Sequence, residues 1–99
     1  MNSVTSKLSE QQLLALAEQC NEQGDPWQAV VHCRTLLSVS EDHADALALL
    51  GQCLAATGDL PSAGHYLGCA IEIDPNRAQP YLYLGEVSSK IGRSRDALR

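Results

Sequence analysis

The sequence is 99 residues long, which is enough for one small domain and too short for a catalytic domain joined to a regulatory one. Its residues are 44% hydrophobic, 4% aromatic and 19% charged, a composition that excludes a disordered chain and fits small helices packed through Leu and Ala. Twelve acidic residues outnumber seven basic ones. The net charge of −5 repels phosphate backbones and anionic lipid, so we expect neither a nucleic acid nor a membrane as partner.

The N-terminal residues and the cysteines indicate in which cellular compartment the protein is expected. Residues 1–8 have neither an apolar core nor a cleavage-site pattern, so we expect an N-terminal extension there and not a secretory signal. No stretch approaches the run of about 18 apolar residues that spans a membrane. The four cysteines, Cys20, Cys33, Cys53 and Cys69, lack the close spacing of a zinc site or a redox pair. We therefore expect a cytoplasmic protein with buried, reduced thiols, no metal and no cofactor.

The first helix is predicted to begin after Ser9, because Ser9-Glu10-Gln11-Gln12 has the form of a capping box. Gly24 is predicted to end the first helix of its unit, since glycine reaches the left-handed conformation of a helix C-terminus without steric cost. Asp25 and Pro26 follow, and they suit the cap and the first turn of a second helix.

The glycine that is predicted to end the first helix of a unit recurs every 34 residues. The repeated glycines are Gly24, Gly58 and Gly92, and an alanine follows each of them five residues later, at Ala29, Ala63 and Ala97. In the central unit, apolar residues at helical spacing run from Leu47 to Leu54, and a second helix is predicted from about Pro61 to Ile73. Small residues recur at Ala17, Gly51 and Gly85. Glycine inside a helix costs about 1 kcal/mol relative to alanine, so its recurrence indicates a close contact between helices.

The central unit carries a recognisable motif: Leu47-x-x-Leu50-Gly51-x-x-Leu54, Gly58, Ala63-x-x-x-Leu67, Ala70 and Pro75. This motif resembles the tetratricopeptide repeat, with Leu in place of the usual aromatic residues. The resemblance implies an all-α fold of tandem antiparallel helix pairs in a right-handed superhelical array. It places a repeat domain at residues 9–99, with two full repeats at about 10–43 and 44–77 and an incomplete third at 78–99.

The third unit is predicted to end only a few residues into its second helix, which would begin after Gly92. Leu84, Val87, Ser88 and Ile91 would then lack the cover that the second helix gives the central unit. We weigh three explanations: the chain is a piece of a longer protein, it borrows a helix from another chain, or the N-terminal segment covers the gap.

The resemblance also implies a function, because tetratricopeptide repeats bind peptides or partner helices in a groove formed by their first helices. The projected groove positions are Gln11, Leu14, Glu18 and Glu22 in the first unit, Asp45, Ala48, Gln52 and Ala55 in the second, and Gln79, Leu82, Glu86 and Lys90 in the third. Family members that hold a chaperone's C-terminal carboxylate use Lys, Asn and Arg at such positions. Leu14, Glu18 and Glu86 stand there instead, so we expect a neutral or basic segment. The alternative is that these carboxylates only solvate a helix face.

A second hypothesis is self-association. Residues 1–43 hold six acidic and two basic residues, whereas residues 78–99 hold two acidic and four basic ones. An acidic start and a basic end could pair head to tail and cover the open third unit. The alternative is that the basic residues only complement the end of a helix.

The residues do not favour an enzyme. His32 and Cys33 are the one neighbouring base and thiol worth weighing, and adjacent residues of a helix point apart. Trp27 is interpreted as a packing residue of the first unit. We expect no catalysis by this chain, although it could be the interaction domain of a larger enzyme.

Overall fold

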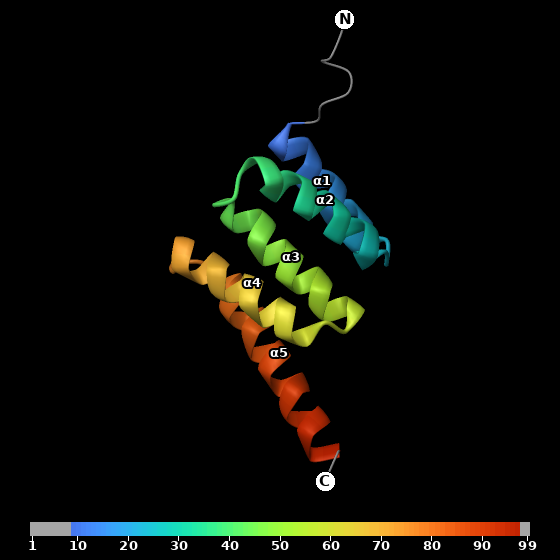
Figure 1. Cartoon of the computed structure of the whole chain (residues 1–99), viewed down its shortest axis with the longest axis vertical. Coiled ribbons are helices and arrows are strands. Elements are labelled where there is room, and N and C mark those ends of the chain that lie inside the picture. The colour runs from blue at the N-terminus through green and yellow to red at the C-terminus, as the bar shows by residue number, and fades with distance from the viewer. Residues whose placement is uncertain (1–8, 98–99) are drawn as a thin grey trace, which may run out of the picture.

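The computed structural model of the chain describes residues 9–97, which form five helices packed in sequence order (Figure 1). They are α1 (Glu10–Glu22), α2 (Pro26–Val39), α3 (Ala44–Thr57), α4 (Leu60–Ile73) and α5 (Ala78–Ala97). Each helix contacts the next, and α3 also contacts both α1 and α5. The result is the all-α array of helix pairs that the repeat predicts. The expected extension at 1–8 lies outside the described residues. No helix within residues 9–97 is both long and apolar enough to cross a lipid bilayer.

The predicted caps begin the first, second and fourth helices. The Gln12 amide donates to Ser9 Oγ at 3.1 Å and the Ser9 amide donates to Gln12 Oε1 at 2.8 Å, which completes the capping box of α1. The carboxylates of Asp25 and Asp59 accept from backbone amides in the first turns of α2 and α4. The cap of α3 was not predicted from the sequence: His43 Nδ1 accepts a hydrogen bond from the Ala46 amide at 3.2 Å.

Two of the three repeated glycines form the predicted turns. Gly24 and Gly58 have φ angles of 85° and 98°, a region that side-chain-bearing residues rarely adopt. The prediction that Gly92 also ends a helix is wrong, because α5 continues through it to Ala97. Gly24 and Gly58 are each followed by an Asp cap and then a Pro, whereas Arg93 follows Gly92 directly and no such pair is present. Without that cap, continuing the helix keeps the backbone hydrogen bonds that a turn would break.

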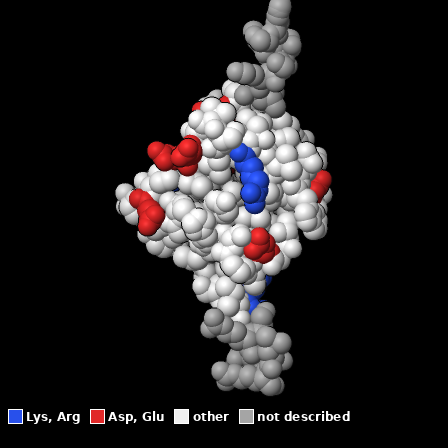
Figure 2. Space-filling view, in the orientation of Figure 1, with Lys and Arg blue, Asp and Glu red and all other residues white. Residues whose placement is uncertain are grey.

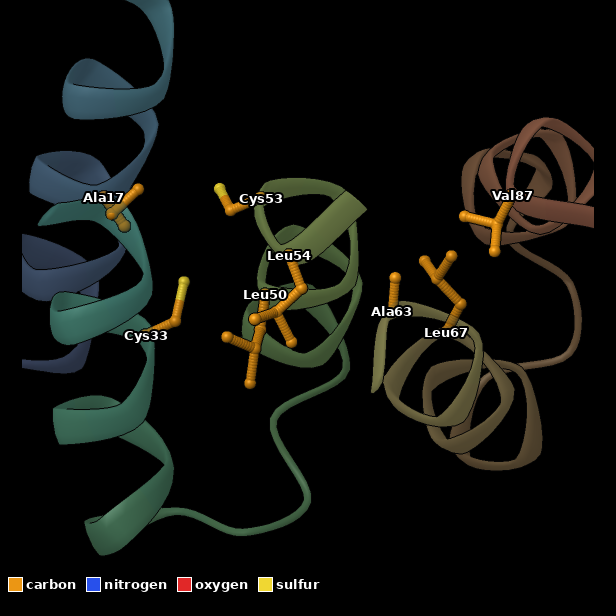
Figure 3. Close-up of a cluster of buried hydrophobic side chains, with 9 residues drawn as sticks. Ala17, Cys33, Leu50, Cys53, Leu54, Ala63, Leu67 and Val87 are labelled. Atoms are coloured by element: carbon orange, nitrogen blue, oxygen red, sulfur yellow. The ribbon is translucent and has the colours of Figure 1, made fainter. Parts of the chain in front are cut away.

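One hydrophobic core runs through all five helices (Figure 3). Its buried members are Ala17 of α1, Ala29 and Cys33 of α2, Leu50, Cys53 and Leu54 of α3, Ala63 and Leu67 of α4, and Val87 of α5. Ala17, Ala29 and Ala63 are completely buried, as expected for small residues at close helix contacts.

The expectation that Val87 lacks cover is wrong, since only 2% of its surface is exposed. Leu84 and Ile91 are half-buried against the same core, and only Ser88 of the four is exposed as expected. The physical reason is that α5 turns this face toward α3 and α4.

A different face of α5 is open instead. Tyr81 and Leu82 are 48% and 62% exposed. Trp27 was expected to pack in the first unit, but it lies 65% exposed in the first turn of α2.

Gly51 is the tightest point of the central helix pair. A Cβ atom added there would lie 2.6 Å from Cγ of Leu67, closer than such atoms approach in proteins. Gly85 occupies the same position one repeat later, and a Cβ there would meet no atom within 4 Å. The repeated glycine is therefore a packing requirement in α3 and not in the described part of the third unit.

Replacing these two glycines by alanine should have opposite effects on stability. We expect Gly51→Ala to lower the free energy of unfolding by about 1–3 kcal/mol, because the new methyl group displaces Leu67 and separates α3 from α4. We expect Gly85→Ala to leave it unchanged or raise it by up to about 1 kcal/mol, because alanine favours the helix and meets nothing. Urea unfolding of both variants measures the difference, and equal effects would contradict the packing argument.

Candidate functional site

The first helices α1 and α3, with the start of α5, form a hollow of about 510 Å³. Its lining residues are Leu14, Glu18, Asn21, Glu22, Asp45, Ala48, Leu49, Gln52, Arg77, Gln79 and Tyr83. A smaller hollow of about 180 Å³ shares Gln52 and Tyr83 with it and is lined further by Ala55, Ala56, Glu86, Val87 and Lys90. Because the two hollows share residues, they form one continuous surface, here named the inner groove.

The structure brings together most of the residues projected onto a groove. Leu14, Glu18, Glu22, Asp45, Ala48, Gln52 and Gln79 line the larger hollow, and Ala55, Glu86 and Lys90 line the smaller one. Two projected residues lie elsewhere. Gln11 is exposed and lines neither hollow. Leu82 lines a further hollow on the open face of α5, which adjoins the inner groove at Glu86 and Lys90.

Sequence reasoning missed several groove residues, among them Asn21, Leu49, Tyr83 and Arg77. Leu49 and Tyr83 stand 34 residues apart, so the repeat itself held the signal for this pair. Tyr83 replaces Leu82 because neighbouring residues point about 100° apart around a helix, and the packing of α5 turns the later one inward. Arg77 had no such signal, because its place in the groove depends on a contact between two units.

Arg77 neutralises part of the groove. Its guanidinium forms an ion pair with Asp45 of α3 and lies 4.0 Å from a carboxylate oxygen of Asp74. Within residues 9–93, no cation lies within 4.0 Å of the carboxylates of Glu18 and Glu22. The α1 end of the inner groove is therefore acidic, whereas Glu86 and Lys90 balance each other at the α5 end.

Comparison with known proteins bears on this architecture. A family model described as tetratricopeptide repeat matches residues 21–79. Thirty-three chains of solved structures also match. One is the C-terminal TPR-containing domain of a Plasmodium falciparum protein described as FK506-binding, with a TM-score of 0.84 and 24% identity. The match covers 88% of this chain and 58% of that one, and at this identity it shows the fold alone. No curated protein matches the chain.

The buried thiols are the remaining candidates for chemistry. Cys33 and Cys53 project into the space between α2 and α3 (Figure 3), and all four cysteines are free. Burial, with a smaller effect of the Cys53 thiol, raises the pKa of Cys33 to about 12. Burial, with a smaller effect of Cys20, raises the pKa of Cys53 to about 11. A nucleophilic cysteine needs a lowered pKa, so these two have the opposite property. Among residues 9–93, whose side chains the structure describes, no three His, Cys, Asp or Glu residues cluster suitably for a metal ion.

The raised pKa values predict how stability depends on pH. The thiols ionise near 9.0 in the unfolded chain but only near 11 to 12 in the folded one, so their contribution is fully present below pH 9.0 and is lost as pH rises through that interval. We expect the free energy of unfolding of the wild type to fall more steeply between about pH 9 and about pH 11 than that of a Cys33→Ala, Cys53→Ala variant. Urea unfolding across this range measures it, and parallel profiles would contradict the expectation.

Proposed function

Because the chain belongs to the tetratricopeptide repeat family, we propose that it binds a peptide or partner helix in the inner groove. As a member of this family it is a protein–protein interaction module. The observation that carries the finer proposal is the continuous inner groove, which runs along α1, α3 and α5. We further propose that it works in the cytoplasm, where its four free thiols would stay reduced.

The groove combines two kinds of contact. Leu14, Leu49 and Tyr83 offer apolar surface to side chains of a partner. Asn21, Gln52 and Gln79 carry amides that both donate and accept hydrogen bonds, so they suit a peptide backbone. This mixture is typical of recognition sites, in which apolar surface supplies affinity and a few polar groups fix orientation.

Charge determines which segments fit. The carboxylates of Glu18 and Glu22 lie without a cationic partner among the described residues, whereas Asp45 is already paired with Arg77. A basic side chain near α1 would gain attraction, and an anionic terminus would meet two like charges. We therefore propose a neutral or basic segment as ligand and not an acidic C-terminus.

A peptide selected on the wild-type protein from a random-sequence library would test this proposal. We expect Glu18→Lys with Glu22→Lys to weaken binding of that peptide by about tenfold or more, because attraction becomes repulsion. The matched control is Asp42→Lys with Glu72→Lys, which makes the same charge change at exposed positions outside the groove. Isothermal titration calorimetry of the three proteins gives the affinities. Equal weakening in both double variants, or no weakening in the groove variant, would contradict the proposal.

A second candidate function is self-association through the open face of α5. The observation that favours it is the hollow of about 580 Å³ lined by Tyr81, Leu82 and Gly85, whose charged lining residues are two cations, Lys90 and Arg93, and one carboxylate, Glu86. In the central unit Leu67 packs against Gly51, the residue equivalent to Gly85, whereas no atom lies within 4 Å of a Cβ placed at Gly85. A second copy could supply that contact, with its acidic α1 facing these cations.

The mass in solution tests self-association. We expect light scattering to show a mass that rises with concentration up to about 1 mM, where even a contact of about −4 kcal/mol becomes visible. Leu82→Glu should keep the protein monomeric, because it places a charge in the contact. Val39→Glu makes the same kind of change at another exposed apolar residue and should have no effect. A wild-type protein that stays monomeric over the whole range would rule this function out.

A further inference from the structure

The outer side of the array carries a second hollow, of about 350 Å³, between the second helices α2 and α4. No Cα atom of α2 comes within 8 Å of one in α4, so these two helices leave a gap over α3. Leu47 and Leu50 of α3 form the floor of the gap, and Leu37 of α2 and Tyr66 of α4 form its walls. This surface is here named the outer hollow. None of its lining residues lines the inner groove.

The small side chain at position 47 explains why the outer hollow exists. The repeat motif usually has Trp at the position of Leu47. In this chain Leu47 packs on Leu37 and Tyr66, and both of these walls remain only half-buried. The smaller side chain therefore leaves apolar walls that a larger one at this position could cover.

The rim of the outer hollow carries one charge of each sign. Arg34 on α2 is exposed, and within residues 9–93 no carboxylate lies within 4.0 Å of it. Glu41 lies seven residues later, just after α2 ends, so the two charges stand at different points of the rim. An apolar hollow with a cation at one end and a carboxylate at the other gives a bound segment a preferred direction.

Further apolar surface adjoins the cation. Val31 is 51% exposed and lies three residues before Arg34, which puts it on the same face of α2. The view in Figure 2 shows a molecular face on which charged side chains are few and scattered over uncharged surface. A partner segment could therefore extend from the hollow along α2 with little charge to desolvate.

From these observations we infer that the outer hollow docks a partner protein through one aromatic side chain next to an acidic residue. The aromatic ring takes the volume above Leu47, between Leu37 and Tyr66. The neighbouring carboxylate faces Arg34. This interaction is separate from the proposed ligand of the inner groove, so one chain could hold two partners at once.

The blocked dipeptide acetyl-Asp-Trp-amide is a minimal probe of this inference. Titrated into the ¹⁵N-labelled protein, it should shift the amide resonances of Leu37, Leu50 and Tyr66 with a dissociation constant in about the millimolar range, as suits so small a ligand. Acetyl-Lys-Trp-amide should bind several times more weakly, and acetyl-Asp-Ala-amide should cause no saturable shift.

Two variants distinguish the contribution of the probe's aromatic ring to binding from that of its charge. Arg34→Glu should weaken acetyl-Asp-Trp-amide by about tenfold and reverse the preference toward the lysine probe. Arg93→Glu, which makes the same charge change away from the outer hollow, should leave both affinities unchanged. Leu47→Trp should fill the hollow from within and abolish binding of both tryptophan probes.

Several results would overturn the inference. They are the absence of shifts at the hollow up to the solubility limit of the probe, an unchanged preference in Arg34→Glu, or full binding by a folded Leu47→Trp protein. Because Arg34 is exposed, its variant keeps the test decisive even if Leu47→Trp fails to fold. Failure here leaves the inner-groove proposal untouched, since the two surfaces share no residue.

Discussion

The close contact between Leu67 and Gly51 fixes how near α4 lies to α3, and the rest of the array depends on this distance. On its other side α3 packs against α2, and beyond the pair α5 rests on both α3 and α4. The completely buried Ala29 and Ala63 allow similarly close packing in the second helices. One core can therefore continue from α1 to α5, although no single helix pair is large enough to enclose a core of its own.

This packing gives the molecule two hollowed faces, both built on α3. On one side Ala48 and Gln52 face the inner groove that α3 forms with α1 and α5. On the other side Leu47 and Leu50 form the floor between α2 and α4. Neighbouring residues of a helix point about 100° apart, so one helix can serve two surfaces without sharing a residue between them.

The two faces differ in the charges that line them. In the inner groove Arg77 neutralises Asp45, so the acidic character is concentrated at Glu18 and Glu22. At the outer hollow Arg34 and Glu41 sum to zero net charge, but because they stand at different points of the rim they would still orient a charged ligand. The net charge of the whole chain therefore does not predict which ligand either surface would favour. That preference would depend on the few charged side chains that a ligand desolvates on binding.

The local features can be predicted from the amino-acid sequence alone. They are the capping box at Ser9, the caps Asp25 and Asp59 and the turns at Gly24 and Gly58, and from them follow the repeat and the helix pairs. These depend on residues within one or two turns, so a pattern contains them. Three other features depend on how the helices pack: Val87 is buried, Trp27 is exposed, and Tyr83 lines the groove in place of Leu82. Those outcomes depend on how far each helix rotates about its own axis. That rotation is set by side chains of other helices, far away in the sequence.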